Sequence, residues 1–243
     1  GSPMIRGFST NRLLYTIDGV RMNTAIFRGG NVQNVISLDA FAMESAEVLF
    51  GSSSTIYGSD AVGGVMSFQT MKPAFSEDEK PLVKGKALMR YSTANKENTG
   101  HFDINVGWKK WAILTSVTAS KYDHLRQGSN GPEDYLKAYH VQRIDSIDVV
   151  VAQEDELLQV ATAYNQINLM QKVRYAPNEN WDIEYGFHYS ETSPYGRYDR
   201  HGELKDGAPK FAEWNYGPQK WMMNQLSINN YSSNVIYDQM SIK

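Results

Sequence analysis

Beyond about Leu82, apolar and polar residues alternate along the chain with a period of two. Between Trp181 and Ser190, for example, large aromatic and aliphatic side chains take every second position, and ionisable or small residues take the others. The stretch from Phe102 to Trp108 shows the same alternation. This period predicts β-strands with one apolar and one polar face. The predicted strands cover residues 83–93, 99–109, 111–123, 159–175, 180–191, 219–231 and 234–243.

The connections between these strands are short on one side of the predicted sheet and mostly long on the other. The short connections are Lys109-Lys110, Ala176–Glu179 and Ser232-Ser233, and the others are residues 93–98, 124–158 and 193–218. This parity is typical of outer-membrane barrels, whereas a soluble β-sandwich has no reason to keep it. The pattern therefore favours a membrane β-barrel with a lipid-facing apolar side, and it predicts that Trp108, Trp181 and Tyr185 point outward.

The first seventy residues have a different texture, with short β-prone runs between turn signals. Arg12–Ile17 is followed by Asp18-Gly19, which favours a hairpin turn, and by a returning strand over Val20–Met22. Asp39 is expected to cap a helical turn over residues 40–45. Further strands are predicted over 35–38, 46–50 and 62–70, a helical turn over 52–56 and a loop over 27–31. These elements indicate a small α+β domain.

A charged segment bracketed by prolines, Lys72–Pro81, separates the two textures and marks a domain boundary. The predicted organisation is a compact domain over residues 1–72, a linker over 73–81 and a strand region over 82–243. The chain begins without a leader and ends in what looks like a continuing strand. We therefore expect it to be an internal fragment of a longer protein.

Composition narrows the function classes. A net charge of −3, from 24 basic and 27 acidic residues, leaves no broad cationic face for nucleic acid. The absence of cysteine excludes disulfides and thiolate metal sites. No apolar run reaches the roughly 18 residues of a transmembrane helix, but barrel strands need none because only alternate residues face lipid. The 15 Tyr, 9 Phe and 5 Trp residues suit the aromatic girdles of a barrel or an ordinary β-rich core.

No catalytic site is expected in the first domain. Its carboxylates have no nearby histidine and no spacing that fits a metal cage; they are Asp39, Glu44, Glu47 and Asp60. Gly58, Gly63 and Gly64 lack the spacing of a dinucleotide-binding fingerprint. Tight turns and close backbone approach explain these glycines better than phosphate binding does.

Four motifs occur in order within the first domain. They are Ile5-Arg6-Gly7, then Ile17-Asp18-Gly19-Val20-Arg21-Met22-Asn23, then Glu47-Val48-Leu49 followed by Gly51, and finally Ile56-Tyr57-Gly58-Ser59-Asp60-Ala61-Val62-Gly63-Gly64-Val65. Together they resemble the plug domain of TonB-dependent outer-membrane receptors. The resemblance implies that residues 1–72 form the C-terminal half of a plug and that 82–243 hold about the first seven strands of a transmembrane barrel of about 22 strands. The residues implied to form the plug motif or plug–barrel contacts are Arg6, Gly7, Asp18, Gly19, Arg21, Glu47, Tyr57, Gly58, Asp60, Gly63 and Gly64.

One position departs from the family. Members commonly carry Arg-Gly-Pro where this chain has Phe50-Gly51-Ser52, and that arginine helps tie the plug to acidic residues of the barrel wall. The replacement leaves Arg6 as the expected tie.

The resemblance implies a Gram-negative outer-membrane transport receptor with no catalytic role, no intrinsic cofactor and no protein-bound metal. Its partners would be outer-membrane lipid, the TonB energy-transducing protein and an extracellular iron ligand. That ligand would be haem, a haemoprotein or a ferric siderophore. Whether a surface lipoprotein is a further partner stays open. No nucleic-acid partner is expected. Two alternatives stay open: the same fold importing cobalamin, a glycan or another nutrient, and a soluble β-rich binding module.

The loop over 193–218 narrows the resemblance. The runs Gly196–Arg200 and 212–219 resemble an Arg-Tyr-Asp-Arg element and a Glu-Trp-x-Tyr-Gly-Pro-Gln element of the haem, haemoglobin and transferrin receptor branch. Histidine can ligate haem iron; His101 and His188 fall on the expected lumen side of strands, and His124 lies beside a loop. The candidate ligand-binding residues are His140, His201, Arg197, Tyr198, Trp214 and Tyr216. Residues 143–158 form either a flap that contacts ligand or partner, or a β-hairpin that extends the barrel above the membrane.

Overall fold

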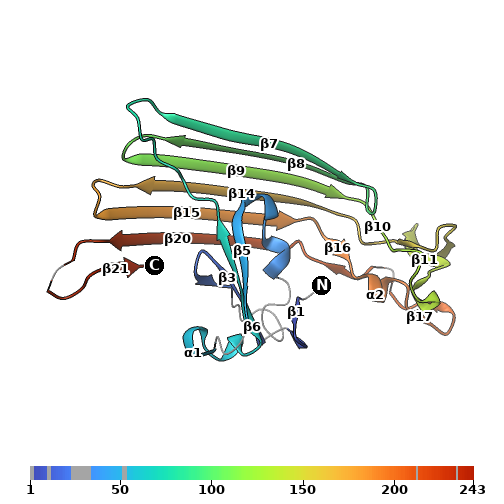
Figure 1. Cartoon of the computed structure of the whole chain (residues 1–243). Coiled ribbons are helices and arrows are strands. Elements are labelled where there is room, and N and C mark those ends of the chain that lie inside the picture. Colours follow the sequence, from blue (N-terminus) through green and yellow to red (C-terminus); the bar gives the residue numbers. More distant parts are fainter. Residues whose placement is uncertain (1–2, 10–11, 23–33, 51–53, 212, 234) are drawn as a thin grey trace.

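The computed structural model describes residues 3–9, 12–22, 34–50, 54–211, 213–233 and 235–243. A seven-stranded sheet forms a wall, and a smaller domain packs against one of its faces (Figure 1). In the described part of the chain, no helix is long and apolar enough to cross a membrane.

The wall is a meander in which strands adjacent in the order of the sheet pair antiparallel. Its strands are β7 (Leu82–Ser92), β8 (Glu97–Gly107), β9 (Trp111–Tyr122), β14 (Tyr164–Tyr175), β15 (Trp181–Thr192), β20 (Lys220–Asn230) and β21 (Met240–Ile242). The seven predicted strands are thus present, but two of them start later than predicted. The strand predicted from residue 159 begins at Tyr164. The last strand begins only at Met240, and the connection predicted as Ser232-Ser233 is a longer loop. Hydrogen bonds from the Ser232 amide to Asn230 Oδ1 (2.8 Å) and from Ser233 Oγ to Asp238 Oδ1 (2.8 Å) hold this loop away from the ladder.

The wall has the reverse of a soluble protein's polarity. Its inner face, toward the small domain, buries polar side chains such as His101, Asn168 and Ser190. Its outer face leaves large apolar side chains exposed; Phe102 is 50% exposed and Leu226 51%. Cross-strand partners share a face, so the paired register aligns these side chains into continuous apolar rows. The outward-facing side chains predicted from the alternation include Trp108 and Tyr185, which are exposed, and Trp181, which is partly exposed.

The small domain is a four-stranded sheet of order β4-β3-β6-β5. Its strands are β3 (Leu13–Ile17), β4 (Val20–Arg21), β5 (Met43–Leu49) and β6 (Gly64–Thr70), beside a hairpin of β1 (Met4–Ile5) and β2 (Phe8–Ser9). The β3–β6 pair is parallel, a pairing that the sequence did not predict. Short helices fill the connections: η2 (Asn34–Ser37), η3 (Ala40–Ala42), α1 (Ser54–Tyr57) and η4 (Ser59–Ala61).

One predicted strand in this domain is wrong. Residues 35–38 belong largely to the 3₁₀ helix η2, where the Leu38 amide donates to the Val35 carbonyl (3.2 Å). Asp39 does cap the next turn, accepting a hydrogen bond from the Phe41 amide (3.0 Å). The loop predicted over 27–31 lies outside the described residues.

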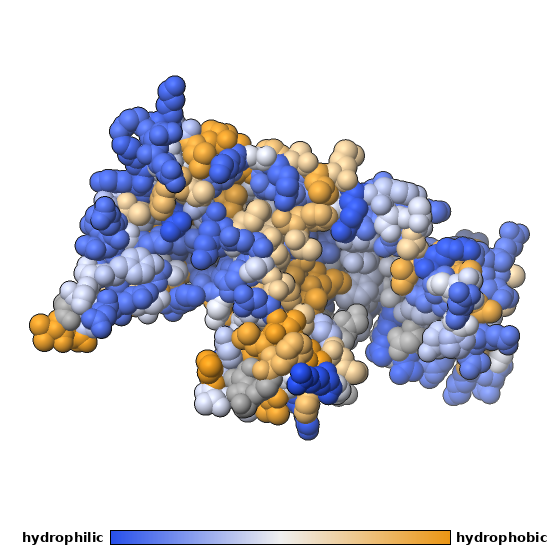
Figure 2. Space-filling view, in the orientation of Figure 1, coloured by the Kyte–Doolittle hydropathy of each residue, from blue (hydrophilic) through white to orange (hydrophobic). Residues whose placement is uncertain are grey.

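The domain buries two apolar clusters. Leu13, Tyr15 and Ile17 face Met223 of the wall, and Leu14 packs with Val65 in the second cluster. Figure 2 shows apolar side chains gathered at the end of the domain away from the wall, where Ile56 is 80% exposed and Phe50 58%.

The long connections gather at one end of the wall (Figure 1). They hold four strand pairs, three of which are β10 (Leu125–Arg126) with β13 (Leu158–Gln159), β16 (Tyr195–Gly196) with β19 (Asn215–Tyr216), and β17 (Leu204–Lys205) with β18 (Ala208–Pro209). Helices η5 (Glu133–Tyr135) and α2 (Tyr198–His201) lie among them. The segment for which flap and hairpin stayed open forms the hairpin β11 (Tyr139–Ile144) and β12 (Ile147–Ala152), turning at Asp145-Ser146 with positive φ of 48° and 66°.

Candidate functional site

The Asp18-Gly19 turn places a carboxylate between the small domain and the wall. Both residues have positive φ, 49° and 83°, as a tight hairpin turn between β3 and β4 requires. Asp18 is 8% exposed, so its charge needs partners within the protein. The turn is thus a local feature whose side chain acts over a long range.

Asp18 receives those partners from both bodies. The Thr70 amide donates to Oδ1 (2.8 Å) and the Thr70 hydroxyl to Oδ2 (2.6 Å). From the wall, Lys172 Nζ lies 3.0 Å from Oδ2 and also 3.2 Å from Glu184 Oε1. Burial opposes the charge, but the Lys172 ammonium and the two Thr70 hydrogen bonds outweigh it and lower the pKa of Asp18. We name Asp18, Thr70, Lys172 and Glu184 the buried charge cluster.

The sequence identified Asp18 but missed the other three members. Lys172 is only 1% exposed, because the polar face of β14 on which it lies is turned toward the small domain. The alternation of residues along β14 was the sequence signal that could have placed this lysine on that face. His188 also enters this region, with Nε2 buried 3.9 Å from Asp18 Oδ2.

Several further contacts hold the small domain to the wall. Gln225 Nε2 donates to the Asp18 carbonyl (3.1 Å), Gln166 Nε2 to the Ile36 carbonyl (2.6 Å) and Thr118 Oγ1 to Asp39 Oδ2 (2.6 Å). The inner face of the wall therefore supplies polar side chains to backbone and carboxylate groups of the domain.

His101 completes this interface. Its ring stacks on Phe41 of the small domain with centroids 5.3 Å apart, while its nitrogens bond Thr118 Oγ1 (2.7 Å) and Asp103 Oδ2 (2.9 Å). Both ring nitrogens are hydrogen-bonded within the wall, and the ring itself packs against the small domain. His101 therefore stabilises the interface between the two.

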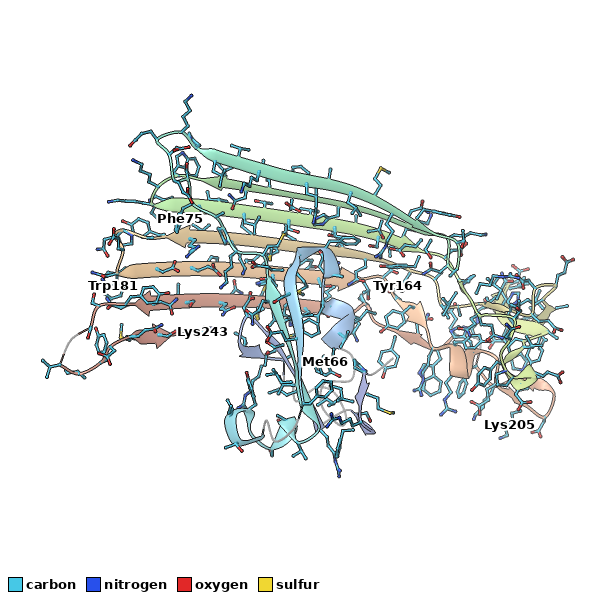
Figure 3. The ribbon with its side chains drawn as sticks, viewed as in Figure 1. Met66, Phe75, Tyr164, Trp181, Lys205 and Lys243 are labelled. Atoms are coloured by element: carbon cyan, nitrogen blue, oxygen red, sulfur yellow. The ribbon has the colours of Figure 1, made fainter. Side chains whose placement is uncertain are left out.

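The linker also lies on the wall. Asn105 exchanges hydrogen bonds with the backbone of Ala74, at 2.8 and 3.0 Å. Arg174 donates to the Pro73 carbonyl (3.1 Å) and stacks over Phe75, whose ring lies beside the short-turn end of the sheet in Figure 3.

The glycine motif provides close backbone approach. A Cβ on Gly63 would lie 2.3 Å from Phe8 Cβ and 2.9 Å from the Arg12 carbonyl oxygen. Gly64 has φ of 139°, and Gly58, at φ of 89°, lies against the Arg21 guanidinium. Of the other motif residues, Tyr57 packs against the Leu14 cluster, Glu47 is exposed on β5, Asp60 lies in η4, and Gly7 has a positive φ in the β1–β2 turn.

In the part of the chain that the structure describes, Arg6 makes no ion pair with the wall, and the tie expected of it stays a prediction. Its guanidinium lies 4.9 Å from the centroid of the Phe50 ring, and both side chains are exposed. In the described part of the chain, the ion pair between the two bodies is instead made by Asp18 and Lys172. Phe50, which stands where family members commonly carry arginine, therefore contacts Arg6. An aromatic ring attracts a cation, whereas a second arginine at this position would repel it.

The loop candidates form a second assembly, organised around Trp214. The Arg197 amide donates to its carbonyl (2.8 Å), and the guanidinium groups of Arg197 and Arg200 lie 5.8 and 5.7 Å from its ring centroid. The Trp214 amide donates to His201 Nε2 (3.2 Å). In this hydrogen bond Nε2 is the acceptor, so its lone pair is engaged.

Tyrosines connect this assembly to the rim of the wall. Tyr216 stacks on Tyr195 at 6.2 Å, Tyr195 contacts Tyr164 at 5.6 Å, and Tyr164 contacts Tyr122 at 4.6 Å between ring centroids. Figure 3 shows Tyr164 at the loop end of the sheet.

His140, Tyr198 and His201 line one small cavity of about 20 Å³. The buried atoms His140 Nδ1 and Tyr198 Oη have no hydrogen-bond partner there. Ligand sites for drug-sized molecules measure about 300–1,000 Å³, so haem cannot enter this cavity as folded. Among the described residues, no cluster of three or more His, Asp or Glu side chains could hold a metal ion. An open groove of about 510 Å³ beside it, lined by Tyr135, Tyr198 and Glu203, is large enough for a small ligand.

The geometry defines a class: a small domain held by buried polar contacts against the polar face of a meander wall. Residues 1–65 match the family model described as TonB-dependent Receptor Plug Domain. The small domain is thus similar to the plug domains of TonB-dependent receptors, and we call it the plug below.

Comparisons with individual proteins extend the similarity into the wall. The chain is 40% identical to the vitamin B12 transporter BtuB of Vibrio vulnificus (strain YJ016) over 130 residues, which are 54% of this chain and 19% of the relative. It is 35% identical to the heme/hemopexin utilization protein C of Haemophilus influenzae (strain 86-028NP) over 104 residues, which are 43% of this chain and 14% of that protein. The structure of the copper transporter OprC shares its fold with a TM-score of 0.63 over 99% of this chain and 30% of that chain, at 13% identity. The names of these proteins describe transport and nutrient utilisation rather than catalysis.

Proposed function

We propose that this chain is part of a TonB-dependent receptor of the Gram-negative outer membrane, which binds an iron-containing ligand outside the cell and imports it with energy delivered through TonB. The observation that carries the proposal is the polarity of the wall, which buries its polar face against the plug and exposes its apolar face. A soluble β-rich binding module would do the opposite, because water favours the polar face. Lipid is the solvent that this outer face fits.

The height of the apolar face supports a membrane setting. On β9 the outward positions run from Trp111, which stacks on Tyr175 at 4.1 Å, to Ala119, and Lys121 follows at the rim. Eight residues at about 3.3 Å each, tilted by about 35–45°, cover about 19–22 Å. Outer-membrane barrels carry an apolar band about 25 Å tall that ends in aromatic girdles.

The proposal also specifies that the transported ligand contains iron. It is supported by the similarity to a heme/hemopexin utilization protein and by the loop motifs around Arg197, Tyr198, Trp214 and Tyr216. These residues lie with His140 and His201 at the long-loop end of the wall, where an extracellular ligand would arrive. Haem, a haemoprotein or a ferric siderophore would bind there only after the loops separate, because the cavity between the two histidines is too small.

Growth of a deletion strain tests this function. The strain, and the same strain complemented with the gene, are grown with haem, haemoglobin or a ferric siderophore as the sole iron source. Loss of growth on one source, restored by the gene, supports the proposal. Equal growth of both strains on every iron source refutes the iron assignment.

Cobalamin is the second candidate cargo. The 40% identity to BtuB favours it, since that relative is named as a vitamin B12 transporter. A cobalamin-dependent growth assay with the same pair of strains separates the two cargoes.

A further inference from the structure

A hollow of about 620 Å³ lies on the outer face of the wall, where the apolar rows meet the long loops. Its floor includes Ala119 and Ile167, and its rim includes Lys121, Asn165 and Pro194. Gln166, which also lines the hollow, bonds the Ile36 carbonyl of the plug, whereas the floor and rim residues named above take part in neither the plug contacts nor the Trp214 assembly.

The strand register explains the hollow. Gly100 of β8 pairs with Ala119 of β9, and Ala119 pairs with Ile167 of β14. Two of the smallest residues of the outer face therefore lie next to each other, and a Cβ on Gly100 would meet open space. The next row toward the middle of the band is apolar and continuous, since Phe102 pairs with Val117 and Val117 with Leu169.

The rim carries an available cation. Lys121 lies in register between Asn98 and Asn165 and is exposed. Among the residues that the structure describes, it makes no ion pair. The one carboxylate at the hollow, Glu191, is already engaged by Lys220 Nζ (2.9 Å) and by the Tyr189 hydroxyl. A net positive charge thus stands above an apolar trough that opens toward the middle of the band.

We propose that this hollow binds an anionic, phosphate-bearing membrane lipid, with its phosphate at Lys121 and Asn165 and an acyl chain over Ala119 and the Phe102–Val117 row. The inference rests on the proposed membrane setting. The trough matches an acyl chain because both are apolar, and the lone ammonium matches a phosphate in charge. Cationic side chains attract anionic lipid surfaces. Because Lys121 lies at the rim of the hollow, it would hold the lipid phosphate at this one place on the wall.

Native mass spectrometry of the detergent-purified protein tests this site. The protein is titrated with phosphatidylglycerol, with zwitterionic phosphatidylethanolamine and, as a headgroup without a chain, with inorganic phosphate. Lys121→Ala removes the cation and Ala119→Trp fills the trough. The matched controls are Lys96→Ala, a cation at the neighbouring loop paired with Asp123, and Ile113→Trp, on the same outer face but nearer the short turns.

We expect phosphatidylglycerol to bind more tightly than phosphatidylethanolamine. K121A should weaken phosphatidylglycerol binding about fivefold, since one basic residue near a lipid surface contributes about that factor. It should weaken phosphatidylethanolamine binding less, because the ammonium of that headgroup already offsets its phosphate. A119W should weaken both lipids, and the controls neither.

Three results overturn the assignment: equal binding of the two lipids, K121A behaving like K96A, or inorganic phosphate displacing the lipid completely. Fractionation of the wild-type protein in cells keeps the two proposals apart. A protein found outside the outer membrane fails the proposed function, whereas one found there without bound lipid fails the lipid site alone.

Discussion

The buried charge cluster makes a prediction about how firmly the plug is held. Replacing Lys172 with Met leaves Asp18 and Glu184 without their shared cation, in a place where Asp18 is 8% exposed. Removing one partner of a buried ion pair costs about 3–5 kcal/mol. At about 1.4 kcal/mol for each factor of ten, the population of released plug should rise about 100- to 5,000-fold.

Replacing Asp18 with Asn should cost less. The amide oxygen can still accept the Thr70 N–H, and Lys172 keeps Glu184 at 3.2 Å. We expect about 1–2 kcal/mol, a rise of about 5- to 30-fold. Adding Asp18→Asn to K172M should recover part of the loss, because it removes one of the two stranded carboxylates.

The chain itself offers a clean assay, since it contains no cysteine. A single Met223→Cys reporter lies on the wall, where it packs against Ile17 of the plug and is 9% exposed. Its rate of thiol labelling, at a fixed urea concentration and with labelling slower than reclosing, reports the open population. Lys109→Met, at an exposed lysine paired with Glu79, is the matched control. Labelling of K172M at the control rate, or slower than that of D18N, would refute the reasoning.

Further predictions concern the plug and the loops. Gly63→Ala should destabilise the plug by about 1–3 kcal/mol, because its Cβ would overlap Phe8 and the Arg12 carbonyl, while Gly100→Ala, facing open space, should change the urea midpoint little. Because the pKa of Asp18 is lowered in the folded protein, its contribution is complete above the ordinary carboxyl value of 3.8 and is lost only as the pH falls through the lower folded value. The urea midpoint should therefore hold from neutral pH to about 4 and then drop more steeply for the wild type than for D18N; equal acid limbs would contradict the cluster. His201→Ala should speed limited proteolysis of the loops, since the Trp214 amide loses its acceptor at a cost of about 1–3 kcal/mol. Tyr198→Phe removes a hydroxyl without a partner and should leave the rate of proteolysis unchanged. Faster cleavage of Y198F would show that this hydroxyl has a partner.

Local features of this protein could be predicted from its sequence because neighbouring residues encode them. The alternation between Trp181 and Ser190 specified a strand with one apolar face, and Asp18-Gly19 specified a tight turn, since both depend only on backbone geometry and a period of two. The hairpin at Asp145-Ser146 was one of two alternatives left open, because its residues fit both a flap and a strand pair. The candidate site was predicted in part. Asp18 and the glycines were identified, Lys172 was not, and the tie expected of Arg6 stays a prediction.

Only the tertiary structure decided which distant groups meet. The parallel pairing of β3 with β6, the contact between Asp18 and Lys172 across 154 positions, and the stacking of Phe41 on His101 arise when two bodies pack together. The same holds for the hollow at Ala119, which exists because strand register sets two small residues side by side. A sequence pattern gives the face on which a side chain lies, whereas its partner depends on the register and packing of segments far apart in the chain.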